Sequence, residues 1–190
     1  MELSVIAYLA LLLAVALLRL YELRISRRHQ AEMVARGATR IVDRRFRWMV
    51  LLHSAVLLGA ALEVIFLDRP FYPLLAAFCF AIFLAANAVR WWVIRTLGDH
   101  WNVQVMDSTA MGIVSSGPFR YVRHPNYAAV FLEMLVLPLI HCAWITAAVG
   151  SLAHLLVLSQ RLATEERVLF ADARYREVMS GKPRFLPGLF

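Results

Sequence analysis

Long apolar runs constrain this sequence more than any other feature. Leu3 to Leu18 carries no charged residue, a second run extends from Trp48 to Leu67, and a third from Phe71 to about Val93. A transmembrane helix needs about 20 mostly apolar residues to cross a hydrocarbon layer of about 30 Å. Of the 190 residues, 61% are hydrophobic and only 17% are charged, which does not suit a water-soluble domain. Each run therefore predicts a membrane-spanning helix.

A fourth apolar stretch is too long for a single crossing. Ala128 to Leu158 contains one formally charged residue, Glu133, and has Pro138 near its middle. Because proline interrupts the hydrogen bonds of a helix, two helices that turn between Pro138 and Trp144 fit this stretch better than one. The sequence thus predicts an all-α, polytopic integral membrane protein with about five transmembrane helices, a cytoplasmic loop and a C-terminal helix. This last helix is expected to continue the fifth span beyond Arg161.

The basic residues predict the orientation of the chain. The net charge is +7, and nineteen of the twenty basic residues fall within 19–47, within 90–123 or after Gln160, whereas only Arg69 falls in a connection on the other side. Cytoplasmic loops carry an excess of Lys and Arg, so we expect the amino terminus outside and the carboxyl terminus in the cytoplasm. Orientation and anionic lipid explain the charge, and no nucleic acid is expected as a partner.

Three smaller features agree with a membrane protein. Arginines follow the first run and no basic segment precedes it, so we expect a retained helix and not a signal peptide. Cys79 and Cys142 lie in apolar runs without metal spacing and predict small buried side chains. The tryptophans fall at predicted span ends, where amphipathic rings favour the membrane interface: Trp48, Trp91, Trp92, Trp101 and Trp144.

Residues 95 to 127 predict a long cytoplasmic loop that ends in a polar motif. The loop is too rich in apolar residues for disorder, so its length favours a functional segment. Pro125 suits the first turn of a helix, which places Arg123 and His124 near a helix amino terminus that attracts anions. The motif could bind a carboxylate or phosphate, or it could cap the helix at the membrane surface.

A second polar group follows the last apolar stretch. Arg161 and Glu165 are four residues apart and share a helix face, whereas Glu166 is rotated by about 100°. If both are exposed, Arg161 and Glu165 form a surface ion pair that stabilises the fold by roughly a few tenths of a kcal/mol. If buried, Arg161 could hold an anionic substrate oxygen, and Glu165 could orient it or accept a proton.

The order of these motifs resembles that of the isoprenylcysteine carboxyl methyltransferase family. Over residues 85–190 the chain has Gly117-Pro118-Phe119, Arg123-His124-Pro125-x-Tyr127, a helical hairpin, Arg161-x-x-x-Glu165-Glu166 and a tail with Pro183 and Pro187. The resemblance implies an integral membrane enzyme that binds S-adenosyl-L-methionine with its cytoplasmic loop and lacks a Rossmann domain. The sequence agrees, since it has no Gly-x-Gly-x-x-Gly motif.

The resemblance also implies which residues form the site. Arg161 and Glu165 match the pair on the substrate side, which makes them the expected catalytic residues. Met111 and Phe119 depart from the eukaryotic members, which have a polar residue and a tyrosine there. The positions implied to bind the cofactor are Gln104, Met111, Gly112, Ile113, Val114, Phe119, His124, Pro125, Asn126 and Tyr127.

The sequence leaves the methyl acceptor open. The resemblance implies a hydrophobic, membrane-partitioned acceptor, either an isoprenylcysteine carboxylate or an alkylated polyketide such as an alkylpyrone or alkylresorcinol. A carboxylate needs only to be aimed by Arg161, whereas a phenol or enol must lose a proton, for which Glu165 is the candidate base. Two alternatives are a phosphatidylethanolamine N-methyltransferase and a reductase-like relative that binds a nicotinamide cofactor.

Six polar residues lie within or beside the apolar runs: His53, Glu63, Asn87, Glu133, His141 and His154. We expect them to hydrogen-bond between helices, with the alternative that Glu133 lines an acceptor tunnel. Their spacing predicts no metal site. The chain is expected to form a single membrane domain over 1–190, with two spans in 1–67 and a catalytic core in 71–190, in the inner membrane if the source is bacterial.

Overall fold

The computed structural model describes residues 2–41 and 46–185. Arg44 and Arg45 of the first basic segment, and Leu186 and Pro187 of the expected tail, lie outside these ranges. Two short strands, β1 (Thr39–Arg40) and β2 (Met106–Asp107), pair antiparallel. The α-helices within the described ranges are α1 (Leu3–Ala35), α2 (Phe46–Phe66), α3 (Pro73–Leu97), α4 (Pro125–Leu139), α5 (Trp144–Leu169) and α6 (Ala173–Met179).

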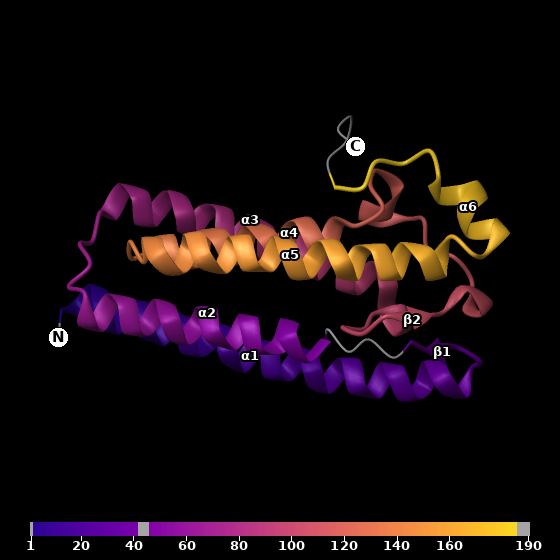
Figure 1. Cartoon of the computed structure of the whole chain (residues 1–190), viewed down its shortest axis with the longest axis horizontal. Coiled ribbons are helices and arrows are strands. Elements are labelled where there is room, and N and C mark those ends of the chain that lie inside the picture. The colour runs from indigo at the N-terminus through magenta and orange to yellow at the C-terminus, as the bar shows by residue number, and fades with distance from the viewer. Residues whose placement is uncertain (1, 42–45, 186–190) are drawn as a thin grey trace.

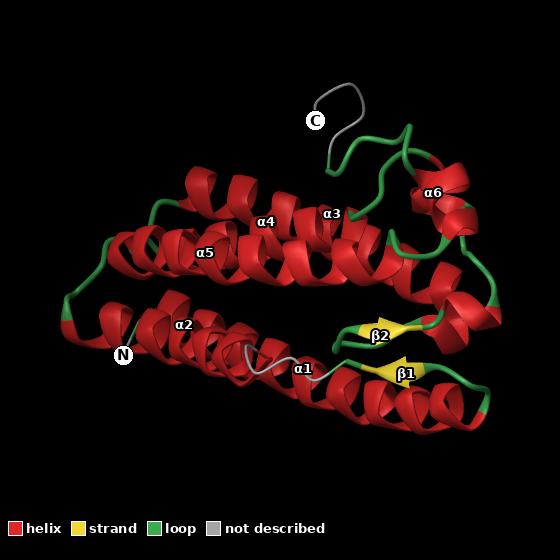
Figure 2. Cartoon of the chain, turned by 45° about the vertical axis from the view of Figure 1, so that its right-hand side comes forward, coloured by secondary structure: helices red, strands yellow, loops and turns green. Residues whose placement is uncertain are grey.

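The long helices run side by side in an elongated bundle (Figure 1). α1 and α2 form one layer and α3, α4 and α5 form the other, with α4 between α3 and α5 and α2 packed against α5. The loop between α3 and α4, the β1–β2 pair and α6 gather at one end of the bundle, which we call the site end (Figure 2). The turns that follow α2 and α4 lie at the opposite end.

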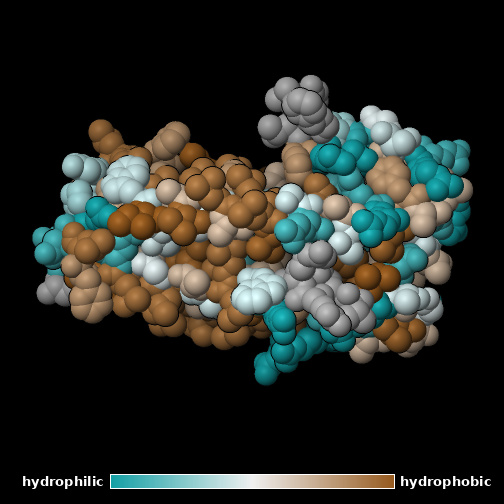
Figure 3. All heavy atoms as spheres, viewed as in Figure 1, coloured by the Kyte–Doolittle hydropathy of each residue, from teal (hydrophilic) through white to brown (hydrophobic). Residues whose placement is uncertain are grey.

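The surface of the bundle is that of an integral membrane protein. α1, α2, α3 (continued to His100) and α5 are each long and apolar enough to cross a membrane. Large hydrophobic side chains such as Leu13, Leu51, Leu74 and Leu156 are exposed on them, and a broad hydrophobic surface gives way to polar residues at the site end (Figure 3). The predicted all-α membrane fold is confirmed.

The segment from 128 to 158 forms two helices, as expected. α4 ends at Leu139 and α5 begins at Trp144, so the chain turns just after Pro138. α4 has 15 residues, which at about 1.5 Å per residue gives roughly 22 Å, less than the full hydrocarbon thickness. The fourth of the five predicted spans is therefore a short helix held between α3 and α5.

α1 continues far beyond its apolar run and supports the loop at the site end. The helix ends at Ala35, and its second half places Ser26 and Met33 in fully buried positions. Ser26 Oγ accepts a hydrogen bond of 2.9 Å from the Val103 N–H, and His29 Nδ1 lies 2.8 Å from the Trp101 carbonyl oxygen. β1, which follows α1, pairs with β2 of the same loop.

Trp101 departs from its predicted environment. Its side chain is only 2% exposed, so it belongs to the packed interior of the loop and not to the membrane interface. The prediction was wrong because the loop folds back over α1 and covers the ring, whose edge packs against His29. Cys79 and Cys142 are buried and unpaired, as expected.

A network of buried ion pairs joins α1, α3 and α4. Arg90 Nη2 lies 2.6 Å from Glu22 Oε2, Arg19 Nη1 lies 2.7 Å from the same oxygen, and Arg19 Nη2 lies 2.6 Å from Glu133 Oε2. Charges at membrane depth are costly unless they are paired. The network therefore requires α1 to keep its position against α3 and α4.

The other intramembrane polar residues divide into two groups. Glu63 of α2 bonds to α5, whereas His53 and Asn87 contact the Met49 and Phe83 carbonyls of their own helices. The expectation of bonds to another helix therefore holds for Glu63, for Glu133 and for His141, whose Nε2 lies 3.4 Å from Ser4 Oγ of α1. It does not hold for His154, whose ring nitrogens have no hydrogen-bond partner among the described residues. Nor does it hold for His53 and Asn87, whose side chains are satisfied by main-chain carbonyls one turn back.

The start of α5 is anchored by Glu63. Its carboxylate accepts hydrogen bonds from the N–H groups of Ile145 and Thr146 at 3.0 and 2.7 Å and from the Thr146 hydroxyl at 2.7 Å. Arg69 Nη2 lies 2.8 Å from the same carboxylate. Free N–H groups at the first turn of a helix need such acceptors, so one side chain holds α2 and α5 together.

Glu63→Ala should destabilise the bundle. The substitution leaves buried N–H donors at the start of α5 without an acceptor, at a cost of about 1–3 kcal/mol. Thermal unfolding in detergent, followed by circular dichroism, measures the loss. Glu32→Ala is the matched control, since the Glu32 side chain forms an exposed pair with Arg28, worth about 0.5 kcal/mol. Equal melting temperatures for the two variants would contradict the anchoring role.

Candidate active site

A cavity of about 230 Å³ lies at the site end, between the loop and helices α3, α4 and α5. Its wall includes eleven of the twelve residues predicted from the sequence: Gln104, Gly112, Ile113, Val114, Phe119, His124, Pro125, Asn126, Tyr127, Arg161 and Glu165. The structure thus brings together loop residues and helix residues that are up to about sixty positions apart in the chain.

Met111 is the predicted site residue that does not line the cavity. Its side chain packs against a cluster formed by Met33, Ala38 and Met106. An apolar thioether gains more from this packing than from a polar cavity wall. The sequence had already set Met111 apart, because the eukaryotic members of the family carry a polar residue there.

The course of the loop depends on two glycines. Gly112 has φ +105° and follows a short 3₁₀ turn, and a Cβ there would point into open space. Gly117 has φ +56°, and a Cβ there would lie 2.4 Å from Thr96 Oγ1. Residues other than glycine rarely adopt these backbone conformations. Gly112 therefore lets the loop turn, and Gly117 lets it pack closely on α3.

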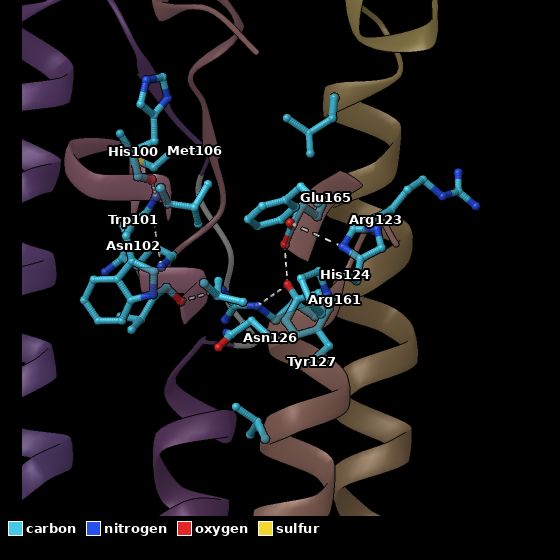
Figure 4. Close-up of a pocket in the computed structure, with 18 of the residues that line it drawn as sticks. His100, Trp101, Asn102, Met106, Arg123, His124, Asn126, Tyr127, Arg161 and Glu165 are labelled. Atoms are coloured by element: carbon cyan, nitrogen blue, oxygen red, sulfur yellow. Dashed lines mark hydrogen bonds and ion pairs between the residues drawn. The ribbon is translucent and has the colours of Figure 1, made fainter. Parts of the chain in front are cut away.

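Tyr127 connects the two predicted catalytic residues (Figure 4). Its hydroxyl donates a hydrogen bond to Glu165 Oε2 and accepts one from Arg161 Nε at 3.2 Å. Arg161 also donates to the Val103 carbonyl of the loop, and its side chain is buried. Arg161 is therefore buried, as in the second alternative, whereas Glu165 is partly exposed. Arg161 joins α5 to both α4 and the loop.

The arrangement suits the handling of an anionic oxygen. A guanidinium group presents planar N–H donors and keeps its charge when it is buried, so Arg161 can hold a carboxylate or phenolate in a defined orientation. Glu165 and Tyr127 form a hydrogen-bonded pair beside it that can accept and pass on a proton. Val93, Val130, Val157 and Leu158 supply an apolar wall to the same cavity.

Glu166 is the anion that binds at the start of α4. His124 is the residue that precedes the first turn of α4, and its Nε2 lies 3.3 Å from Glu166 Oε1, while Arg123 Nη1 lies 3.4 Å from the same oxygen. The sequence leaves open whether Arg123 and His124 bind an anion or cap the helix at the membrane surface, and the structure places the chain's own Glu166 carboxylate beside them. Glu166 occupies a different face of α5 from Arg161 and Glu165, as expected.

The C-terminal segment covers this side of the site. Arg184 Nη2 pairs with Glu166 Oε2 at 2.7 Å, and the main-chain N–H groups of Arg123 and His124 donate to the carbonyls of Pro183 and Arg184 at 2.9 and 2.8 Å. Lys182 Nζ donates to the Phe119 carbonyl at 2.8 Å. Burial lowers the pKa of the Lys182 ammonium group.

α6 completes the enclosure. Asp172 precedes it and accepts hydrogen bonds from the N–H groups of Arg174 and Tyr175, and the Arg174 side chain lowers the pKa of Asp172 to about 2. Tyr175 and Met179 of α6 line the cavity, and burial raises the pKa of the Tyr175 phenol. The sequence predicts a helix that continues the last span beyond Arg161, and α5 indeed extends to Leu169. α6 is a separate helix of only seven residues.

Four polar residues of the long helices line the cavity and were not predicted as site residues: Arg19, His53, Arg90 and His154. Arg90 Nη1 lies 3.5 Å from Asn126 Oδ1, so the buried ion-pair network contacts the predicted site directly. Arg19 and Arg90 looked like orientation signals because they belong to basic segments. Their position inside apolar helices, where charges usually face the bundle interior, was the available signal.

The fold and cavity define an integral membrane protein whose polar site is enclosed at one end of a helix bundle. Residues 77–171 match the model of the isoprenylcysteine carboxyl methyltransferase (ICMT) family, and the chain belongs to this family. It is accordingly a membrane methyltransferase.

The chain is also similar to two bacterial proteins. It is 27% identical over 160 residues to the uncharacterized protein YpbQ of Bacillus subtilis strain 168, an alignment that covers 84% of this chain and 95% of YpbQ. It is 32% identical over 153 residues to an uncharacterized protein of Haemophilus influenzae, covering 80% and 88% of the two chains.

A solved structure shares the fold. It is that of the eukaryotic intramembrane Ras methyltransferase ICMT, with a TM-score of 0.59 and 18% sequence identity over 78% of this chain. This chain spans 55% of the length of that protein. At this identity the similarity establishes the helical architecture, and the chemistry must be argued from the residues of this chain.

Glu166→Gln should loosen the cover over the site. The amide keeps the shape of the carboxylate but loses the charge that Arg123, His124 and Arg184 share, so the hydrogen bonds from Arg123 and His124 to Pro183 and Arg184 should open more often. Hydrogen exchange of these two amides should accelerate about tenfold or more, which corresponds to about 1.4 kcal/mol. Glu177→Gln, on the exposed face of α6, is the control. Unchanged exchange in Glu166→Gln would contradict the proposed cover.

Proposed function

We propose that this protein is an S-adenosyl-L-methionine-dependent O-methyltransferase that acts on a hydrophobic, membrane-partitioned acceptor. One observation carries the proposal: a single cavity is lined by the loop segment from Gln104 to Phe119 and by the cluster of Arg161, Tyr127 and Glu165, with apolar helix side chains beside them. A polar cofactor and a lipid-like acceptor can therefore meet in one enclosed place.

The residues of the loop fit the cofactor. Gly112 exposes its main chain to open space, which suits hydrogen bonding to an adenine ring by the backbone of residues 112–114. Phe119 offers an aromatic face, and His124 with Asn126 lies where a charged amino-acid group can be received. When bound, S-adenosyl-L-methionine supplies a methyl group on a positively charged sulfur.

The chain's own residues prepare the acceptor. Arg161 holds the acceptor oxygen as an anion, and the apolar wall with the covering loop keeps water away. For a phenol or enol, Glu165 accepts the proton, either directly or through the Tyr127 hydroxyl to which it is hydrogen-bonded. For a carboxylate, no proton need be removed and Arg161 alone suffices.

The same proposal includes the orientation and extent of the protein. The site end carries most of the basic residues, so it faces the cytoplasm, where the cofactor is dissolved, and the amino terminus lies outside. Residues 1–190 act as one domain, because α1 supplies both the ion-pair network and the support of the loop. In a bacterial cell, a membrane protein whose site end faces the cytoplasm lies in the inner membrane.

The purified protein should bind S-adenosyl-L-methionine and transfer its labelled methyl group to an oxygen of a component of a total lipid extract. Arg161→Ala should lower kcat/KM about 100-fold or more, because a buried donor to the reacting oxygen is lost, which typically corresponds to about 3–4 kcal/mol. Arg167→Ala, an exposed position on the same helix, should retain full activity. Scintillation counting and mass spectrometry of the product measure both.

Three results would contradict this function. The first is that calorimetry detects no binding of S-adenosyl-L-methionine to the purified protein at millimolar concentration. The second is a methylated phosphatidylethanolamine as the product with Arg161→Ala tolerated, which would indicate an N-methyltransferase. The third is displacement of the cofactor by NADPH, which would indicate a reductase-like protein.

A further inference from the structure

His154 of α5 is a buried polar residue that the proposed mechanism does not use. It is 3% exposed and lines the cavity, and within the described residues neither of its ring nitrogens has a hydrogen-bond partner. Its ring is flanked by those of His53, at 5.4 Å between centroids, and Phe131, at 6.4 Å. His53 lines the same cavity and uses its Nδ1 for the Met49 carbonyl.

His154 differs from the other buried side chains that have an unpaired polar atom in the described structure. Arg123, Glu133 and His141 each make a polar contact through another atom of the same side chain. Ser151 and His154 make none through their side chains, and of these two only His154 lines the cavity. Leaving a buried polar group without a partner is unfavourable, so a ligand that supplies a partner binds more tightly.

His154 lies directly on the membrane side of the proposed reacting site. It precedes Arg161 by seven residues, or two helical turns, so both project from the same face of α5. Side chains of a helix lean toward its amino terminus, which brings the Arg161 guanidinium group toward His154. Met49 lies between the surroundings of Arg161 and those of His154. Its sulfur lies 3.4 Å from Arg161 Nη1, and its carbonyl oxygen lies 2.7 Å from Nδ1 of His53, whose ring flanks that of His154.

We propose that His154 binds a second, uncharged oxygen of the methyl acceptor while Arg161 holds the oxygen that is methylated; this inference rests on the proposed function. A neutral imidazole offers one donor and one acceptor, which match a hydroxyl or a carbonyl group. The nearby charges of Arg19, Arg90, Glu22 and Glu133 are paired with one another, so the surroundings offer no excess charge for a second anion.

The acceptor class follows from this contact. The hydrocarbon of a prenyl chain offers His154 no partner, so an isoprenylcysteine could reach it only with the amide beside its carboxylate. A lipid whose ring carries two oxygen substituents would satisfy both residues. We therefore expect a doubly oxygenated ring with an alkyl chain to be a better acceptor than the same ring with one oxygen.

The test compares three probes on the purified full-length protein: 5-pentadecylresorcinol, 3-pentadecylphenol, which lacks one ring oxygen, and N-acetyl-S-farnesylcysteine. The wild type should methylate the resorcinol with a kcat/KM at least tenfold above that of the phenol. His154→Leu should reduce this ratio to about one without weakening cofactor binding, and His154→Gln should restore part of it. His141→Leu, which removes a buried histidine at the opposite end of the bundle, should keep the wild-type ratio.

Titration calorimetry of S-adenosyl-L-methionine binding to the wild type and each variant shows which proposal fails, the methyltransferase function or the role of His154. If the wild type binds no cofactor, the proposed function itself fails. If it binds cofactor but methylates only N-acetyl-S-farnesylcysteine, or neither ring lipid, the assignment of His154 is overturned while the methyltransferase proposal stands. An unchanged ratio in a His154→Leu variant that still binds cofactor also overturns the assignment.

Discussion

The ion pairs of Glu22 with Arg90 and Arg19 are the interaction on which the rest of the structure depends. Charges buried among apolar helices must be matched, and here the matching joins α1 to α3 and, through Glu133, to α4. α1 is thereby held where its second half can support Trp101 and Val103 of the loop. Arg90 also contacts Asn126, so a network at membrane depth and the wall of the candidate site form one connected unit.

This connection explains how so small a membrane protein can enclose a cavity. The loop between α3 and α4 has little regular structure, and it depends on contacts with α1, β1 and the C-terminal segment for its shape. The cavity beneath it has polar residues from the loop and apolar ones from the helices. Under the proposed function, this mixed wall lets a water-soluble methyl donor and a lipid-like acceptor bind side by side.

The sequence predicted the helices well because membrane crossing requires long apolar runs, and it predicted the turn before α5 because Pro138 interrupts such a run. It grouped the twelve candidate residues through motif order, and eleven of them line one cavity. It did not predict that Glu22 meets Arg90, 68 positions away, or that Glu166 occupies the start of α4. Pairings over such distances follow from how helices pack, which local spacing does not encode. Trp101 was misjudged for the same reason, since its ring packs against His29 of α1, and Met111 lies outside the cavity because it packs on a cluster that includes Met33 of α1.

Under the proposed function, the methyl donor binds between the loop and the start of α4. Photolabelling with radioactive S-adenosyl-L-methionine under ultraviolet light, followed by peptide mapping of the protein in detergent, locates this binding site. We expect the label within residues 104–127, and we expect it to disappear when excess S-adenosylhomocysteine is added. A label that S-adenosylhomocysteine displaces but that lies on α2, or on the turn between α4 and α5 at the opposite end of the bundle, would rule this site out.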